Sequence, residues 1–425
     1  MKRTFEAFWN KARAAEAAGD LDGCASAQLA MYALTHQDRS LLRQVDTTYL
    51  RVDVFIRVVA AALLAQERGD VELAERYFAA FPQSLLSRPG YFPEFRATRG
   101  QLAYARGAME EAETWLSVHL DAYPQDETAW LLLGNAAARQ GHLLQAVRAY
   151  DEALHQKAHL VEAAENRQVV IERLMAPAGA PLPVLRLREP DGALGIDPTD
   201  WEVVRRLPIF INCRDRVDCL QRLVRWLLAA GYRQIILLDN ASTYAPLLAY
   251  YDRIQSRRVR VVRLGENLGH QALWTSGILE WLDVRTPYVY TDPDVLPGEA
   301  CPPRFLRAFA QQLALHPAIR KVGAALVYED ITYRDAEAIK SEEASYYHVP
   351  LGGDAYFANV DTTFALYRNV RFYHRGPSIR LAGPYAFRHL PWYYDYAHLP
   401  EDEQYYLVHA NASSSIGNVM ARSKA

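Results

Sequence analysis

Residues 288–294 read Tyr-Val-Tyr-Thr-Asp-Pro-Asp, an apolar run that ends in two carboxylates. Aromatic and β-branched residues in a short run predict a buried strand over 288–291. Asp292 and Asp294 would then lie at the carboxyl end of this strand, where two buried carboxylates need hydrogen-bond donors or a cation. Carboxylate oxygens of this kind suit Mg²⁺ or Mn²⁺ that bridges a diphosphate. The alternative is a plain Asp-Pro-Asp turn.

Three similar strands are predicted upstream, at 206–212, 235–238 and 259–262, and amphipathic helical runs separate them. This alternation predicts an α/β domain with a Rossmann-like, doubly wound and mostly parallel sheet. Ligands on such sheets bind at the carboxyl ends of the strands. Polar residues follow all four strands, and we expect them to converge on one edge: Asn212, Asp239, Asn267, Asp292 and Asp294.

The N-terminal half has a different pattern, because up to about residue 175 the chain is rich in Ala, Leu and Glu at helical spacing. A repeat of about 34 residues runs through it, and in period and residue order it resembles the tetratricopeptide repeats. Weaker copies fall at 50–83 and 10–35. In the best copy, Gly134, Gly141, Ala146 and Tyr150 correspond to Gly100, Gly107, Ala112 and Leu116.

A stretch rich in Pro and Gly separates the two halves, and it excludes a continuous helix. The expected domains are therefore a helical repeat domain at 1–175, a linker at 176–200 and an α/β domain at 201–425. A repeat domain of this kind either packs against a second copy of itself, which gives a homodimer, or binds a protein partner on its concave face.

Composition excludes several classes of function. The 425 residues include 47 Lys and Arg against 50 Asp and Glu, so a net charge of −3 gives no bulk attraction to nucleic acid or membranes. Four cysteines without CxxC spacing argue against a disulfide scaffold or a structural zinc site. The longest apolar run, 58–65, is too short for a transmembrane segment, and the N-terminus lacks a signal-peptide core. We expect a cytoplasmic protein.

Four motifs follow one another in the second half: Asp239-Asn240-Ala241-Ser242, then Asn267 with Gly269 and Gly277, then Asp292-Pro293-Asp294, and finally Gly352-Gly353-Asp354 with Asp361. In this order they resemble the nucleotide-sugar glycosyltransferases of the A-type fold, in particular the large inverting family two. The resemblance covers roughly residues 205–395. It departs from the family at Asn240, where the family has a second Asp, and at Val360, where the family has Glu.

The resemblance implies metal-dependent, inverting transfer of a sugar from a nucleotide-sugar donor. Asp361 would be the general base that takes the proton of the acceptor hydroxyl. Asp292 and Asp294 would bind manganese or magnesium, and His389 would supply a third metal ligand. Arg388 would bind the donor diphosphate. The structural alternatives are an N-cap before a helix at 362–364 for Asp361, a packed or solvated His389 and a solvated Arg388.

Two donor-binding assignments have equally simple structural alternatives. Asp239 would accept hydrogen bonds from the base or ribose of the donor nucleotide, or it caps the next helix through Ser242 and Thr243. Asn267 and Gly269 would hold the loop beside the donor, or they form an ordinary Asn-x-Gly turn.

The repeats favour a protein acceptor, glycosylated on Ser or Thr in the manner of flagellin-type or surface proteins. One rival interpretation is a transferase that builds a cell-surface polysaccharide. Another is a non-catalytic scaffold that keeps the fold. A nucleotidyltransferase is less well supported, because residues 212–216 lack a Gly-rich phosphate loop.

Overall fold

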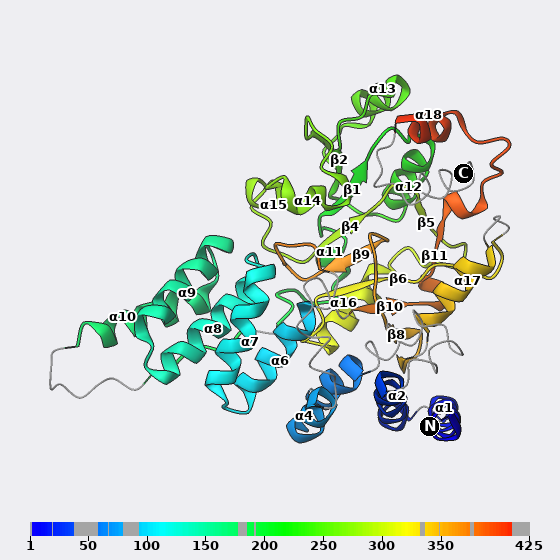
Figure 1. The fold of residues 1–425 in the computed structure, drawn as a ribbon. Coiled ribbons are helices and arrows are strands. Elements are labelled where there is room, and N and C mark those ends of the chain that lie inside the picture. Colours follow the sequence, from blue (N-terminus) through cyan, green and yellow to red (C-terminus); the bar gives the residue numbers. More distant parts are fainter. Residues whose placement is uncertain are drawn as a thin grey trace. The chain divides into compact units, whose positions relative to one another are not determined.

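The structure is a computed structural model that describes residues 2–18, 20–37, 58–66, 68–79, 93–176, 185–190, 193–331, 336–347, 349–374 and 378–409. It divides into two units, whose elements are labelled in Figure 1. Unit 1 comprises Met1–Gly192 and Val370–Pro377, and unit 2 comprises Ala193–Asn369 and Ser378–Ala425. The chain passes from one to the other inside the expected linker, of which 177–184 and 191–192 lie outside the described residues.

Unit 1 consists of helices that pack as antiparallel neighbours, α1 on α2, α6 on α7 and α8 on α9. The weak repeat copy at 10–35 falls on α1 and α2, and part of the copy at 50–83 lies outside the described residues. Residues 58–66 are also helical. The helices are α1 (Lys2–Ala17), α2 (Leu21–Gln37), α4 (Val71–Ala79), α6 (Pro93–Ala105), α7 (Met109–Ala122), α8 (Glu127–Gln140), α9 (Leu143–Gln156) and α10 (Val161–Leu174).

The repeat is visible in the structure as the same close contact between two helices, formed at two places one repeat apart. A Cβ atom on Gly134 of α8 would lie 2.5 Å from Cε1 of Tyr150 on α9. A Cβ atom on Gly100 of α6 would lie 2.7 Å from Cγ of Leu116 on α7. The two glycines are one repeat apart, and so are Leu116 and Tyr150. In each pair of helices a glycine therefore packs against a large side chain at the point where the helices cross.

Unit 2 contains a nine-stranded sheet in the order β3-β2-β1-β4-β9-β6-β10-β8-β7 and a two-stranded ribbon, β5 with β11. Strands β3, β2, β1 and β4 are mutually parallel, as the sequence predicts. The remainder is mixed, because β9 runs antiparallel between β4 and β6, and β8 runs antiparallel to β10 and β7. The strands are β1 (Ile209–Cys213), β2 (Ile235–Asp239), β3 (Val259–Arg263), β4 (Tyr288–Thr291), β5 (Val295–Pro297), β6 (Lys321–Ala324), β7 (Pro350–Gly352), β8 (Ala355–Phe357), β9 (Ala365–Tyr367), β10 (Ile379–Leu381) and β11 (Phe387–His389).

Helices cover the apolar faces of this sheet. Helix α12 shows why: Leu220, Leu223, Val224 and Leu227 recur at helical spacing, and all four are fully buried. Helix α16 packs on β6 and β9, and α14 contacts β1. The helices are α11 (Trp201–Val204), α12 (Asp218–Ala229), α13 (Ala245–Ile254), α14 (Ala272–Thr275), α15 (Ile278–Trp281), α16 (Leu306–Leu315), α17 (Ala336–Ser345) and α18 (Glu401–His409).

Two expectations about local structure are wrong. The first strand begins at Ile209 and not at 206; Pro208, which has no N–H, precedes it and accepts from Val289 through its carbonyl. No helix follows Asp361 either, because residues 362–364 are bends that lead into β9. The segment pairs with strands on both sides, so its backbone bonds go to β4 and β6. The N-cap interpretation of Asp361 is therefore excluded.

Candidate functional site

The strand order of unit 2 creates a reversal point between β1 and β4. The chain runs outward from β1 to β2 and β3 and then returns to the other side of β1 for β4. In open α/β sheets, ligands bind outside the carboxyl ends of the strands at such a point. The predicted polar residues lie there or just beyond: Asn212 in β1, Asp239 at the end of β2, Asn267 after β3, and Asp292 and Asp294 after β4.

Asp294 forms a buried ion pair with Arg216, which lies in the loop after β1. Nη1 of Arg216 donates to Oδ2 of Asp294 over 2.6 Å. The Nε and Nη2 atoms of the same guanidinium donate to the Glu403 carboxylate of α18 over 2.7 and 2.6 Å. Its Cζ atom lies 3.8 Å from the ring centroid of Tyr406. All three charged side chains are less than 10% exposed, so loss of one partner would leave a buried charge unpaired.

The two carboxylates of the motif differ sharply in acidity. Burial, together with the neighbouring carboxylates of Asp294 and Asp361, raises the pKa of Asp292 to about 8. Burial acts in the same direction on Asp294, but Arg216 and His389 outweigh it and hold the pKa of Asp294 below its usual range. At neutral pH the free protein therefore carries an ionised Asp294 beside a largely protonated Asp292. Adjacent carboxylates with pKa values pushed apart are typical of functional sites.

The ribbon of β5 and β11 brings His389 to this motif. His389 pairs with Val295 in the ribbon, and its Nε2 lies 3.6 Å from Oδ2 of Asp294. Arg388 precedes it in β11, and successive strand residues point to opposite faces. Nη2 of Arg388 donates to Asp330 over 2.6 Å, and its guanidinium lies over Tyr393. The structure thus places His389 beside Asp294, and it pairs Arg388 with Asp330.

The carboxylates of Asp292 and Asp294 fit a divalent cation that takes its remaining ligands from a substrate. Across the described ranges, no three His, Cys, Asp or Glu side chains are grouped as a complete metal site. Mg²⁺ and Mn²⁺ nevertheless often bind through one or two carboxylates and take further ligands from substrate phosphates and water. Burial and the neighbouring carboxylates disfavour the ionised form of Asp292, and a bound cation would favour it. Asp292 and Asp294 are the residues that would hold this cation.

Two asparagines hold the loop after β3 against β1 and β2. The Nδ2 atoms of Asn240 and Asn212 donate to the carbonyl of Gly269 over 3.0 and 3.3 Å. Oδ1 of Asn240 accepts from the N–H of Leu268 over 2.6 Å. The expected turn is present, since Oδ1 of Asn267 accepts from the N–H of Gly269 over 3.0 Å. Gly269 has φ +68, a conformation that residues with a Cβ rarely adopt.

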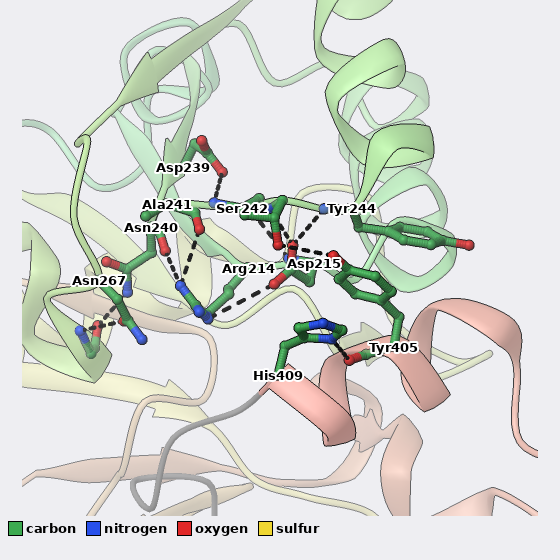
Figure 2. A network of polar contacts seen from close by, with 12 residues as sticks. Arg214, Asp215, Asp239, Asn240, Ala241, Ser242, Tyr244, Asn267, Tyr405 and His409 are labelled. Atoms are coloured by element: carbon green, nitrogen blue, oxygen red, sulfur yellow. Dashed lines mark hydrogen bonds and ion pairs between the residues drawn. The ribbon is translucent and has the colours of Figure 1, made fainter.

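The loops after β1 and β2 are interlocked, as Figure 2 shows. Asp215 is fully buried, and its Oδ1 accepts from the N–H groups of residues 243 and 244 over 2.6 and 2.9 Å, just before α13. Nη1 of Arg214 donates to the carbonyls of residues 240 and 241 over 2.7 and 3.2 Å. These contacts fix the backbone of the edge at which β1 and β2 end.

Asp239 is 3% exposed and lies beneath this interlocked turn. Its Oδ1 accepts from the N–H of Ser242 and from the hydroxyl of Tyr251, both over 3.2 Å. The turn contact with Ser242 that the sequence offers as the structural alternative is therefore present. The other half of that alternative is wrong, because the N–H of Thr243 bonds to Asp215. A contact of Asp239 with a donor nucleotide stays a prediction.

Asp361 is exposed and lies next to the motif after β4. The N–H of Asp292 donates to the carbonyl of Thr362 over 3.1 Å, which ties the start of the motif to the residue after Asp361. The charge of Asp361 also contributes to the raised pKa of Asp292. Asp361 is thus an exposed carboxylate beside the acidic motif, and its role as a base stays a prediction.

The sequence does not predict the residues that pair with the charge of Asp294 or that hold the loops of the site in place. Arg216 and Glu403 are 187 residues apart, and nothing in either local pattern predicts that they pair. One available signal was the Arg-Asp-Arg run at 214–216, where three charged residues follow a buried strand directly. All three take part in buried or partly buried contacts. In sequence Asn240 is only a departure from a motif, and local pattern does not predict its hydrogen bonds to the loop after β3.

Comparison with known proteins adds little. No family model matches the chain, and no similar sequence is found among curated proteins. A solved structure of an O-GlcNAc transferase mutant from Thermobaculum terrenum is 18% identical, with a TM-score of 0.25. The match covers 49% of this chain and 42% of that chain, and so weak a similarity carries no argument about fold or activity. No helix in the described part of the chain is long and apolar enough to cross a membrane.

Proposed function

We propose that unit 2 is a glycosyltransferase of the A-type fold that uses a nucleotide-sugar donor. The observation that carries the proposal is the acidic motif after β4. Asp292 and Asp294 lie beside the reversal point of the sheet, with pKa values pushed apart and with the exposed Asp361 as a neighbour. A site of this kind suits a ligand that carries phosphate groups and a reaction that needs a carboxylate base.

The nucleotide would bind at the carboxyl ends of β1 and β2. Asn212 and Asn240 hold the loop of Asn267 and Gly269 in place there, so this edge is rigid before the donor arrives. Asp239 would contact the base or ribose, and Arg388 would bind the diphosphate after leaving Asp330. Mn²⁺ or Mg²⁺ on Asp292 and Asp294 would neutralise charge on the diphosphate leaving group.

Asp361 would act as the general base of an inverting transfer. The acceptor oxygen forms a bond to the anomeric carbon as the bond from that carbon to the diphosphate breaks, and the acceptor proton passes to Asp361. A positioned base of this type typically contributes about 10²–10⁴-fold to the rate. Because the leaving group is a diphosphate, no separate acid residue is required.

The acceptor would be a Ser or Thr hydroxyl of a protein recruited by unit 1, in the manner of flagellin-type or surface-protein modification. A transferase for surface polysaccharide remains the second candidate, since the same site would accept a sugar hydroxyl. A scaffold without activity is the third. These candidates differ in the acceptor, so release of nucleoside diphosphate with and without a protein acceptor separates them.

Release of nucleoside diphosphate from a panel of nucleotide sugars, with Mn²⁺ or with EDTA, tests the proposal. We expect release with one class of donor, and a loss of at least about tenfold in Asp292→Asn, which keeps the side-chain size but removes the charge. Asp283→Asn is the matched control, because it makes the same change at an exposed residue that pairs with Arg285. Absence of release for every donor, with the protein folded, would contradict the proposed activity.

A further inference from the structure

A segment of the chain's own linker, residues 185–190, lies on the helices of unit 1. Leu185 and Leu187 are partly buried and pack against the cluster formed by α8, α9 and α10, while Arg186 and Arg188 are exposed. Alternation with a period of two is the pattern of an extended chain that turns one side to a surface. The segment is therefore held as an extended peptide.

Two buried asparagines bind the main chain of this segment. Oδ1 of Asn166 accepts from the N–H of Arg188 over 2.6 Å, and its Nδ2 donates to the carbonyl of the same residue over 2.9 Å. Nδ2 of Asn135 donates to that carbonyl as well, over 3.0 Å. These bonds go to backbone groups, which every peptide has. The two asparagines therefore recognise an extended chain through its backbone, while the guanidinium of Arg188 pairs separately with Glu165 of α10 over 2.6 Å.

The asparagines are held in position beforehand. Both are fully buried, and a buried amide is costly unless its polar atoms are paired. Oδ1 of Asn135 accepts from the hydroxyl of Tyr150 over 2.8 Å and from Nδ2 of Asn166 over 2.7 Å. These bonds orient the Nδ2 atom of Asn135 toward the bound chain. An orientation fixed in this way reduces the entropy lost on binding a peptide.

The residue after Arg188 is recognised by its charge. The Glu189 carboxylate accepts from the hydroxyl of Tyr104 over 2.8 Å and pairs with Nη2 of Arg139 over 2.5 Å. The guanidinium of Arg139 also lies 4.7 Å from the ring centroid of Tyr104. Since the Glu189 side chain is 49% exposed, this pairing lies at the surface, where a competing carboxylate can reach it.

The recognising residues lie along one line across three helices. Tyr104 on α6, Asn135 on α8 and Asn166 on α10 each lie about one turn nearer the start of the helix than the residue before. The helices α6 and α8 pack together, and so do α8 and α10. An extended chain that crosses these helices therefore meets one polar side chain from each.

We propose that Tyr104, Asn135, Arg139 and Asn166 form a binding site for an extended peptide that carries a Glu side chain, which we call the asparagine site. Residues 185–190 occupy it within the same chain, and a peptide of the same pattern, apolar-x-apolar-x-Glu, displaces them. The proposal deepens the acceptor recruitment proposed above, but it concerns binding alone. Its test contains no nucleotide sugar, so a failure here leaves the transferase assignment untouched, and the reverse also holds.

The test is titration of the full chain with a fluorescent peptide that has the sequence of residues 183–190, Pro-Val-Leu-Arg-Leu-Arg-Glu-Pro, followed by anisotropy. A peptide that competes with an occupant binds with an affinity reduced by the fraction of empty sites. Glu189→Gln in the chain weakens the occupant, so we expect it to raise the peptide's affinity about tenfold or more. Leu187→Ala should act in the same direction through a different contact. Glu172→Gln, an exposed residue of α10, is the matched control and should change nothing.

Two further variants show that the peptide binds at the asparagine site. In the Glu189→Gln chain, adding Asn166→Ala should lower the affinity at least about tenfold, and a peptide with Gln in place of its Glu should bind at least about tenfold more weakly. Asn10→Ala, an exposed helical residue, is the control for the first change. The proposal is overturned if the Glu189→Gln and Leu187→Ala chains bind the peptide no better than the unaltered chain, or if Asn166→Ala leaves binding unchanged. Residues 185–190 would then be a permanent part of unit 1.

Discussion

Nη1 of Arg216 donates to Oδ2 of Asp294 over 2.6 Å, and this bond joins the loop after β1 to the acidic motif after β4. Glu403 of α18 accepts two further hydrogen bonds from the same guanidinium, so α18 is also linked to the site. One arginine thereby sets both the position and the charge of Asp294. The geometry of the acidic motif consequently depends on residues from three distant parts of unit 2.

Arg216→Met should lower the free energy of unfolding by about 3–5 kcal/mol, because it leaves Asp294 and Glu403 buried without a cation. Urea unfolding of the purified chain measures this loss. Arg285→Met is the matched control: its pair with Asp283 is more than 60% exposed on both sides, so unfolding should be nearly unchanged. Equal, small losses in the free energy of unfolding for the two substitutions would show that the ion pairs of Arg216 do not stabilise unit 2.

The raised pKa of Asp292 predicts that the folded chain loses stability as the pH rises. Its pKa is about 8 in the folded chain against 3.8 for the free side chain, so the folded state binds more protons between these values. Stability therefore falls as pH rises through that window. Asp292→Asn removes this penalty, and without divalent cations it should exceed the unaltered protein in free energy of unfolding by at least about 1 kcal/mol at pH 8.

The comparison of Asp292→Asn with the unaltered chain is best made between pH 5 and 8.5. Asp294 contributes with the opposite sign: its lowered pKa stabilises the fold above pH 3.8, and this contribution is lost only as the pH falls below that value. The advantage of Asp292→Asn should thus grow steadily with pH across the chosen range. Stability curves that run parallel would mean that Asp292 ionises normally. Asp283→Asn should follow the unaltered chain throughout.

Local patterns predicted the parallel half of the sheet well. The strands β1 to β4 are short runs of mainly apolar residues, and amphipathic helical segments separate them in the sequence. The structure places all four close to the expected residues. Strands β7 to β11 have three residues each, too short for a periodic signal, and β9 pairs with two strands that lie far away in sequence. The helix after Asp361, offered by the sequence as the structural alternative, is wrong for that reason.

In the candidate site, too, local sequence predicts some features and not others. Residues at strand ends, such as Asp292 and Asn212, follow from local sequence because a strand delivers them to one edge of the sheet. The contacts that set their chemistry do not, since Arg216 meets Glu403 across 187 residues. The buried pair with Arg216 predicts that Asp294→Ala loses stability, so Asp292→Asn is the cleaner probe of the motif.

Gly134→Ala should destabilise unit 1, although Gly to Ala within a helix normally stabilises. The added Cβ would lie 2.5 Å from the ring of Tyr150, which is fully buried and cannot move aside. We expect a loss of about 1–3 kcal/mol. Gly100→Ala would bring its Cβ within 2.7 Å of Cγ of Leu116, which is also fully buried, so it should destabilise unit 1 as well. Thermal unfolding measures both, and a stabilised Gly134→Ala would refute the close helix contact.

Asp361→Asn should lower turnover by at least about 10²-fold and leave donor affinity nearly unchanged, as for a lost general base. Asn keeps the size of the side chain at this exposed position, so we expect the melting temperature to hold. Steady-state kinetics together with donor binding separate the two effects. Near-normal turnover would move the base elsewhere, with the exposed Asp354 as the next residue to substitute.

The central claim is that the carboxyl edge of β1, β2 and β4 binds a nucleoside diphosphate through the acidic motif. Isothermal titration of uridine, guanosine, cytidine, thymidine and adenosine diphosphates with Mn²⁺ tests it most directly. We expect one of them to bind, the affinity to fall at least about tenfold in Asp292→Asn or in EDTA, and Asp361→Asn and Asp283→Asn to bind as the unaltered chain does. No binding by any of the five, or equal binding in folded Asp292→Asn, would contradict the account.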